Sequence, residues 1–111
     1  MQKSPIFSMS QVAAAAVSAA RFVGLLTGQH CAAGAKAQGV SQYAAATGEA
    51  FAVDVHGTTI VEAGGVIAPG GPIKSDANGK AIAQGGTGEI LGYAVTASSA
   101  DGQKIEALLR F

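Results

Sequence analysis

The chain has 111 residues, enough for one domain, and its seven basic and seven acidic residues cancel to a formal net charge of zero. The cationic residues are scattered singly. A nucleic-acid binder needs several of them on one face, so that class is excluded. A single cysteine excludes both an intrachain disulfide and a four-cysteine zinc site.

Charged residues make up only 13% of the chain, and much of its 49% hydrophobic fraction is Ala. A core of small side chains buries little apolar surface per residue, so the isolated domain should be marginally stable. A surface with few charges is also poorly solubilised. The composition therefore predicts a protein that neighbouring subunits complete, as an oligomer, within a larger assembly, or both.

An N-terminal arm is predicted over residues 1–20, ahead of a β-barrel-like domain over 21–111, because the first segment contains no Gly and no acidic residue. Pro5 lacks an amide donor and disfavours helix at the residue before it, so the arm should begin extended. A frayed terminus is the alternative, since disorder concentrates at chain ends. The apolar residues Ile6 and Phe7 favour docking on the edge of a partner sheet.

The Ala-rich part of the arm favours a short helix over residues 11–18, with Ser8 or Ser10 as its cap. A helix of this length is marginal in water, so we expect the segment to be weakly structured until it finds a partner. The longest apolar stretch, 12–20, falls well short of the about 20 residues of a membrane span. It also lacks the Leu-rich centre of a signal peptide.

From Arg21 onward the pattern changes to short strands separated by Gly or Pro, which predicts an all-β domain, a small barrel or sandwich. The dipeptide Asn78-Gly79 marks a hairpin turn, because it tolerates positive φ at both central positions. A turn is also expected at His56-Gly57. Strands are predicted at residues 21–26, 38–43, 50–55, 58–63, 73–76, 80–83, 89–96 and 104–110.

Two residue pairs have side chains that catalysis or metal binding could use. His30 and Cys31 are adjacent, and adjacent strand residues point to opposite faces, so we interpret them as a loop histidine and a half-buried small cysteine. Asp54 and His56 share a strand face by the period of two, but no third member completes a catalytic or metal triad. We interpret this pair as solvent-facing, and a small hydrolase that uses it is the less favoured alternative.

The Gly-rich segments 64–65 and 85–88 do not continue into Gly-Lys-Ser/Thr and a helix, so they indicate turns and not phosphate cradles. The segment 76–79 lacks the ligand series and the closing Glu of a calcium loop. We therefore predict no catalytic, cofactor-binding or metal-binding residue, no cofactor, and a protein that is not an enzyme.

One segment resembles the central motif of the capsid-cement, or head-decoration, proteins of tailed bacteriophages. Residues 63–81 read AGGVIAPGGPIKSDANGKA, in which a Pro/Gly turn precedes a hairpin with the pattern Pro-x-x-x-Asp-x-x-Gly-Lys. Residues 51–57, 90–102 and the apolar strand 104–109 are similar to the flanking parts of that family. The resemblance covers about residues 21–111.

The resemblance implies a compact β-tulip, a barrel-like domain that associates as a homotrimer and carries no catalytic residue. It implies a virion protein, made in the host cytoplasm, that binds the exterior of the mature capsid and stabilises contacts between major-capsid subunits. Nucleic acid and membrane are not expected as partners. The alternative is a β-domain of a surface or virion assembly that recognises a receptor or a carbohydrate, for which Tyr43 and Tyr93 are the available aromatic residues.

We expect the arm to contact the capsid. Ordering an arm costs about 1–2 kcal/mol per residue, so it should order only where contacts are many, and trivalent attachment would multiply weak contacts. Deletion of residues 1–20 is expected to leave a folded, oligomeric domain that no longer decorates shells. The expected contact residues are Lys3, Pro5, Ile6, Phe7, Val12 and Val17.

Overall fold

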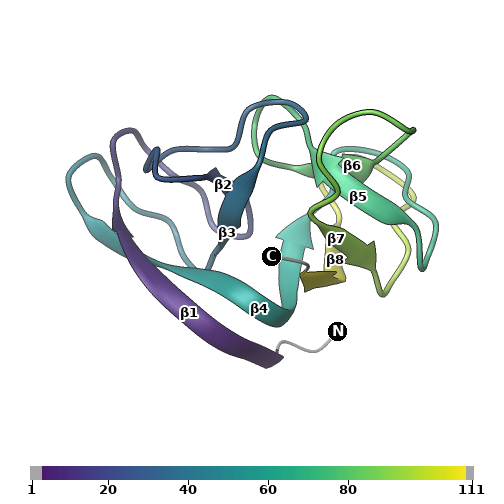
Figure 1. The fold of residues 1–111 in the computed structure, drawn as a ribbon, viewed down its shortest axis with the longest axis horizontal. Helices are drawn as coiled ribbons and strands as arrows, with labels where there is room; N and C mark the ends of the chain where they lie inside the picture. The colour runs from purple at the N-terminus through teal and green to yellow at the C-terminus, as the bar shows by residue number, and fades with distance from the viewer. Residues whose placement is uncertain (1–3, 110–111) are drawn as a thin grey trace.

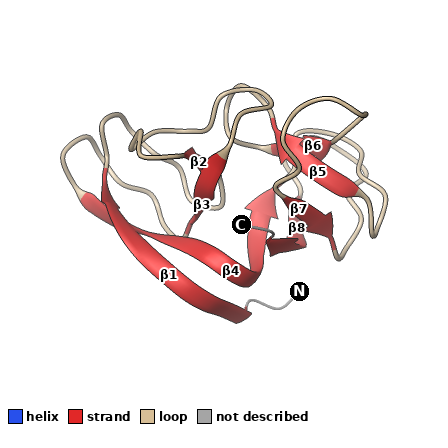
Figure 2. Ribbon diagram, viewed as in Figure 1, coloured by secondary structure: helices blue, strands red, loops and turns tan. Residues whose placement is uncertain are grey.

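The computed structural model describes residues 4–109, with side chains from residue 8 onward. This part of the chain contains eight strands and no helix, which confirms the predicted all-β class (Figure 2). Nothing in this range could cross a membrane as an apolar helix. The strands are β1 (Ser4–Val12), β2 (Phe22–Gly24), β3 (Ala37–Ser41), β4 (Ala50–Glu62), β5 (Pro72–Ser75), β6 (Ala81–Ala83), β7 (Gly92–Ala94) and β8 (Lys104–Leu109).

The named strands pair antiparallel in the order β2-β3-β4-β8-β7-β5-β6, and β1 is added beside β4 (Figure 1). The long, bent strand β4 connects the two halves of the sheet, because its first part pairs with β1 and β3 and its last part with β8. At Val53 and Asp54, β4 is paired on both edges.

The two ends of the sheet meet, so the barrel is nearly closed. The amide of Phe22, in β2, donates to the carbonyl of Gly79 at 2.7 Å, in the turn between β5 and β6. A parallel bridge joins Ala63, just after β4, to Ala81 in β6. These contacts confirm the barrel-like architecture that the strand spacing predicted.

The prediction of a helix over residues 11–18 is wrong. β1 runs to Val12, and the segment that follows is irregular and tied to a neighbouring loop. The amide of Ala13 donates to the carbonyl of Glu49 at 2.8 Å, and that of Val17 to Ala45 at 2.9 Å. These tertiary hydrogen bonds, with burial of Ala13 and Val17, outweigh the intrinsic helix preference of alanine.

The turn expected at His56-Gly57 is also wrong, since β4 continues through both residues. Gly57 adopts a φ of 92°, and opposite it the β1–β4 register shifts on both sides of Phe7. The strand bends here without reversing, because β1 remains paired on both sides of the irregularity.

The turn predicted at Asn78-Gly79 is present, but only Gly79 takes a positive φ, of 77°. The carboxylate of Asp76 accepts hydrogen bonds from the amides of Asn78 at 2.8 Å and Lys80 at 2.9 Å. This side-chain-to-backbone pattern holds the loop in a longer turn than the two-residue hairpin that the dipeptide favours.

The buried apolar side chains form two clusters. The main one fills the barrel and includes Phe22, Ile73, Leu91 and Ile105. The second cluster lies between the start of β4 and the segment after β1. Its members are Ala13, Val17, Val23, Ala45, Phe51 and Val53. The predicted arm therefore contributes side chains to a core.

Candidate functional site

The predicted arm forms an edge of the sheet. β1 pairs with β4 from Ser4 opposite Thr58 to Val12 opposite Ala50, and β4 is its only partner among the described strands. The other edge of β1 is therefore directed away from the sheet, in the position from which an edge strand can pair with another chain. Figure 1 shows β1 along the outer side of the molecule.

The six predicted contact residues have different positions. Lys3 lies outside the described residues, and Pro5, Ile6 and Phe7 lie in β1, where the backbone alone is described. Val12, at the end of β1, is 65% exposed, so its side chain is available to a partner. Val17 is only 3% exposed and packs in the second core, so it supports the fold from inside.

An apolar surface that the sequence pattern did not reveal lies beside β1, in the turn after β2. Leu25 and Leu26 are 52% and 84% exposed. The sequence pattern assigned both to a strand, and the sign of a turn was the Thr27-Gly28 pair directly after them. Leu26 also has a φ of 61°, in the left-handed region that residues other than Gly, Asn and Asp rarely enter.

Buried Gln38 connects this turn to β1. Its side-chain oxygen accepts the amide hydrogen of Leu26 at 3.2 Å, and its side-chain nitrogen lies 3.6 Å from the sulfur of Met9. Met9 is itself 41% exposed, so an apolar side chain of β1 lies next to the leucine turn. Gln38 is buried, and its contacts therefore fix the turn against the strand.

Gly28 attaches the turn to the end of β1. Its amide donates to the side-chain oxygen of Gln11 at 3.0 Å, and its carbonyl accepts from the amide of Ala14 at 2.8 Å. A Cβ atom at this position would lie 2.4 Å from the carbonyl oxygen of Val12, so the close approach requires glycine.

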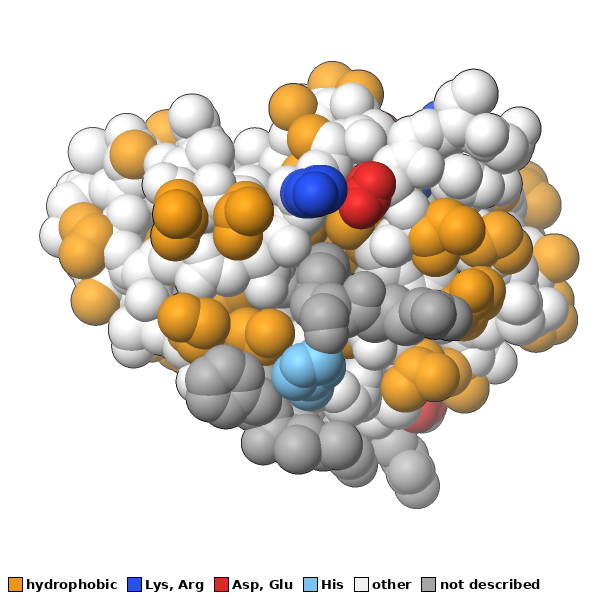
Figure 3. Space-filling view, in the orientation of Figure 1, with side chains coloured by type: hydrophobic (Ala, Val, Ile, Leu, Met, Phe, Trp, Pro, Cys, Tyr) orange, Lys and Arg blue, Asp and Glu red, His pale blue; other side chains and the backbone are white. Residues whose placement is uncertain are grey.

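We call Met9, Leu25 and Leu26 the apolar edge surface. In the view of Figure 3, hydrophobic side chains gather over β1 and β2, and the Lys or Arg and Asp or Glu side chains visible there lie toward the middle and the other side of the face. An uncharged surface with exposed large aliphatic side chains is suited to contact with another protein.

Asp54 is fully buried, which corrects its interpretation as solvent-facing; His56 is exposed. The Asp54 carboxylate accepts hydrogen bonds from Ser8 at 3.1 Å, from Thr59 at 2.7 Å and from the side-chain nitrogen of Gln42. These donors come from β1, from β4 and from the loop after β3. The carboxylate therefore joins the predicted arm to the rest of the sheet.

The Nε2 atom of His30 accepts a hydrogen bond from the amide of Ser18 at 2.9 Å, so this nitrogen is unprotonated and the imidazole is neutral. Burial lowers the pKa of His30, the positive charge of Arg21 lowers it further, and Asp76 opposes the shift. The adjacent Cys31 is fully buried, which corrects its interpretation as half-buried, and burial raises the pKa of its thiol. Cys31 is thus a core residue, and His30 holds the chain between β1 and β2.

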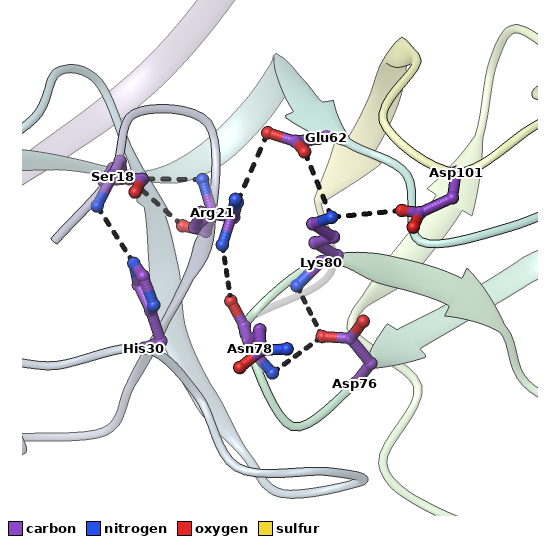
Figure 4. Close-up of polar contacts among 9 residues, drawn as sticks. Ser18, Arg21, His30, Glu62, Asp76, Asn78, Lys80 and Asp101 are labelled. Atoms are coloured by element: carbon purple, nitrogen blue, oxygen red, sulfur yellow. Dashed lines mark hydrogen bonds and ion pairs between the residues drawn. The ribbon is translucent and has the colours of Figure 1, made fainter.

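Charged side chains gather where the ends of the sheet meet (Figure 4). Glu62 pairs with Arg21 and with Lys80, each at 3.4 Å, and Arg21 also donates to the carbonyl of Asn78 at 3.0 Å. Asp101 lies 3.1 Å from Lys80, and this hydrogen bond raises the pKa of Lys80. The cluster joins segments from both ends of the sheet, so it helps to close the barrel.

Within residues 4–109, no three side chains of the His, Cys, Asp and Glu types come together as a metal site would require. The polar groups described above are engaged in holding strands and turns together. In this small all-β domain, the apolar edge surface is the feature suited to contact with other proteins.

Comparison with known proteins identifies the family. The chain matches the family model of phage cement proteins over residues 1–110, and it belongs to that family. Its structure is similar to the N base of head fiber gp8.5 of bacteriophage phi29, with a TM-score of 0.77 and 22% identity over 94% of this chain and 93% of that chain. At this identity the likeness shows a shared fold. Comparison with curated protein sequences gives no match.

The family match confirms the sequence-based resemblance and extends it into the arm, which the resemblance left out. The chain is a structural protein of the phage capsid, with a capsid-binding, decorating role.

Proposed function

We propose that this protein binds the exterior of the mature phage capsid and holds neighbouring major-capsid subunits together. The family match over residues 1–110 carries this proposal, and the uncharged apolar edge surface supports it. The test is to mix the purified protein with undecorated, expanded heads built from the major capsid protein of the same phage. Saturable co-sedimentation, with greater resistance of the heads to heat or chelator, is expected; protein that stays in the supernatant would contradict the proposal.

In this proposal β1 contacts the capsid first. Four of the expected contact residues, Pro5, Ile6, Phe7 and Val12, belong to this strand, and Lys3 precedes it in the sequence. An edge strand can accept an extended segment of a partner, because backbone groups on its outer side are directed away from its own sheet. The exposed side chain of Val12 would add apolar contact at the end of this strand. Val12→Lys should weaken co-sedimentation, whereas equal binding would remove Val12 from the interface.

Deletion of residues 1–20 does not test capsid contact by itself. It removes Ala13 and Val17 from the second core and Ser8 from the Asp54 carboxylate, so a loss of binding could follow from a loss of folding. Substitutions of exposed side chains separate the two effects. Whether residues 21–111 fold alone stays a prediction, which circular dichroism of the truncated chain would decide.

The proposal includes association as a homotrimer. Leu108 in β8 is 45% exposed, Val95 just after β7 is 47% exposed, and Tyr93 is the cross-strand neighbour of Leu108. An apolar strand face of this kind supports self-association, since it removes these side chains from water. Light scattering should give the mass of a trimer, and Leu108→Lys should lower it. A monomer at micromolar concentration would contradict this part of the proposal.

Recognition of a receptor or a carbohydrate, the alternative function, depends on the two tyrosines as the available aromatic residues. Tyr43 follows β3 and Tyr93 lies in β7, and β4 and β8 separate these strands in the sheet order. The structure offers no observation that favours this alternative over the capsid-binding role.

A further inference from the structure

Leu26 combines two features that oppose each other in an isolated protein. Its φ of 61° lies in the left-handed region, which Gly, Asn and Asp adopt more readily than leucine, and its side chain is 84% exposed. Gly or Asn would suit both the backbone and the solvent better at this position. Backbone strain at a residue whose apolar side chain is mostly exposed points to a role outside the fold.

The turn that carries Leu26 is held in one conformation. The Leu26 amide is bonded to the buried side chain of Gln38, and Gly28 is attached to the end of β1 through Gln11 and Ala14. Leu25 and Met9 flank Leu26 and are also exposed. The leucine side chains are therefore presented on a fixed backbone, which reduces the entropy that binding must remove.

We propose that the Leu25–Leu26 turn, with Met9 beside it, is an apolar knob that inserts into an apolar pocket on the outer face of the major capsid protein. The inference rests on the proposed capsid-binding function and names the part of the surface that carries the affinity. Three features favour the capsid as the occupant.

The first feature is family membership, which makes the capsid the partner of this chain. The second is position, because the knob is continuous with β1, the edge strand of the proposed contact. The third is chemistry: the knob residues are aliphatic or thioether side chains, so the pocket that receives them should be apolar. A few well-packed side chains near the centre of an interface typically carry most of its binding energy.

Leu26→Asn is the decisive variant, because stability and binding should change in opposite directions. Asn tolerates the left-handed backbone, so the thermal midpoint should stay the same or rise. Loss of the apolar side chain should weaken co-sedimentation with undecorated heads by at least about tenfold. Because the contact is apolar, wild-type binding should change little between low and high salt.

Val66→Asn is the matched control. Val66 is 73% exposed in the loop between β4 and β5, away from the knob in the chain, and its φ is not positive. This variant removes a comparably exposed aliphatic side chain, and it should bind heads as the wild type does. Val66→Asn with the same loss as Leu26→Asn would overturn the assignment of affinity to the knob.

The remaining outcomes distinguish the knob from the function on which it rests. If the wild type binds heads and Leu26→Asn binds equally well, the knob is refuted and the capsid function stands. If the wild type does not bind heads, both are refuted. If Leu26→Asn has a smaller mass than the wild type by light scattering, the turn serves contact between copies of this chain, and the knob is again refuted.

Discussion

The hydroxyl of Thr59 donates to the carboxylate of Asp54 at 2.7 Å, and both residues are buried within β4. A buried carboxylate is tolerated only where hydrogen bonds satisfy its oxygens. Here the other donors come from Ser8 in β1 and from Gln42 after β3. One acidic side chain thus connects the edge strand to the centre of the sheet.

Asp54→Ala should lower the free energy of unfolding by about 3 kcal/mol, because it leaves buried donors without their acceptor. Chemical denaturation measures the effect. Asp101→Ala is the control. Asp101 pairs with Lys80, but its side chain is 67% exposed, so loss of this ion pair should lower the free energy of unfolding by less than about 1 kcal/mol. Equal effects of the two substitutions would show that Asp54 does not hold the strands together.

The Ser18–His30 contact predicts a dependence of stability on pH. The folded pKa of His30 lies below its ordinary value of 6.5, chiefly through burial, so the unfolded chain takes up the proton first. The contribution of His30 to the free energy of unfolding is therefore fully present above pH 6.5. It decreases as the pH falls below 6.5 and levels off below the pKa of His30 in the folded protein. Arg21 and Asp76 are the charged groups that act on the ring, in opposite directions.

Denaturation at a series of pH values between about 8 and 5 tests this behaviour. His30→Asn should have a flatter profile than the wild type over this range, because Asn does not titrate. If His30→Asn keeps the pH profile of the wild type, the dependence of stability on pH belongs to another group.

Phe51→Ala should lower the free energy of unfolding by about 3–4 kcal/mol, because Phe51 is the largest side chain of the second core and is 1% exposed. Val66→Ala is the control, since an exposed side chain should contribute less than about 0.5 kcal/mol. The measurement also bears on the arm, because Phe51 packs in the same cluster as Ala13 and Val17. A small effect at Phe51 would mean that this cluster contributes little to the stability of the domain.

Gly28→Ala should destabilise the protein by more than Gly48→Ala. Both glycines have positive φ, of 67° and 88°, so each substitution should cost about 1 kcal/mol through the backbone. Only at Gly28 would the new Cβ also meet a backbone oxygen, at 2.4 Å, whereas nothing lies within 4 Å at Gly48. Thermal denaturation compares the two variants, and equal melting temperatures would show that the turn moves freely away from β1.

Local patterns in the sequence predicted the all-β class, most strand positions and the turn before Lys80, because strand period and turn chemistry act over a few residues. The same reasoning was wrong where long-range contacts decided the outcome. The helix expected over 11–18 is replaced by hydrogen bonds to a loop about thirty residues later in the chain. At Gly57 the sequence predicts a turn, but β4 only bends there, because its pairing with β1 continues on both sides of the bend.

The sequence by itself determined the fold class, the family and the absence of a recognisable catalytic motif, since these follow from composition, turn residues and motif spacing. The tertiary structure alone placed Leu26 beside Met9 and buried Asp54 among donors from separate strands. Such juxtapositions depend on which strands pair and where the sheet bends. Pairing is set by burial and backbone hydrogen bonds across the whole domain, which no local pattern contains.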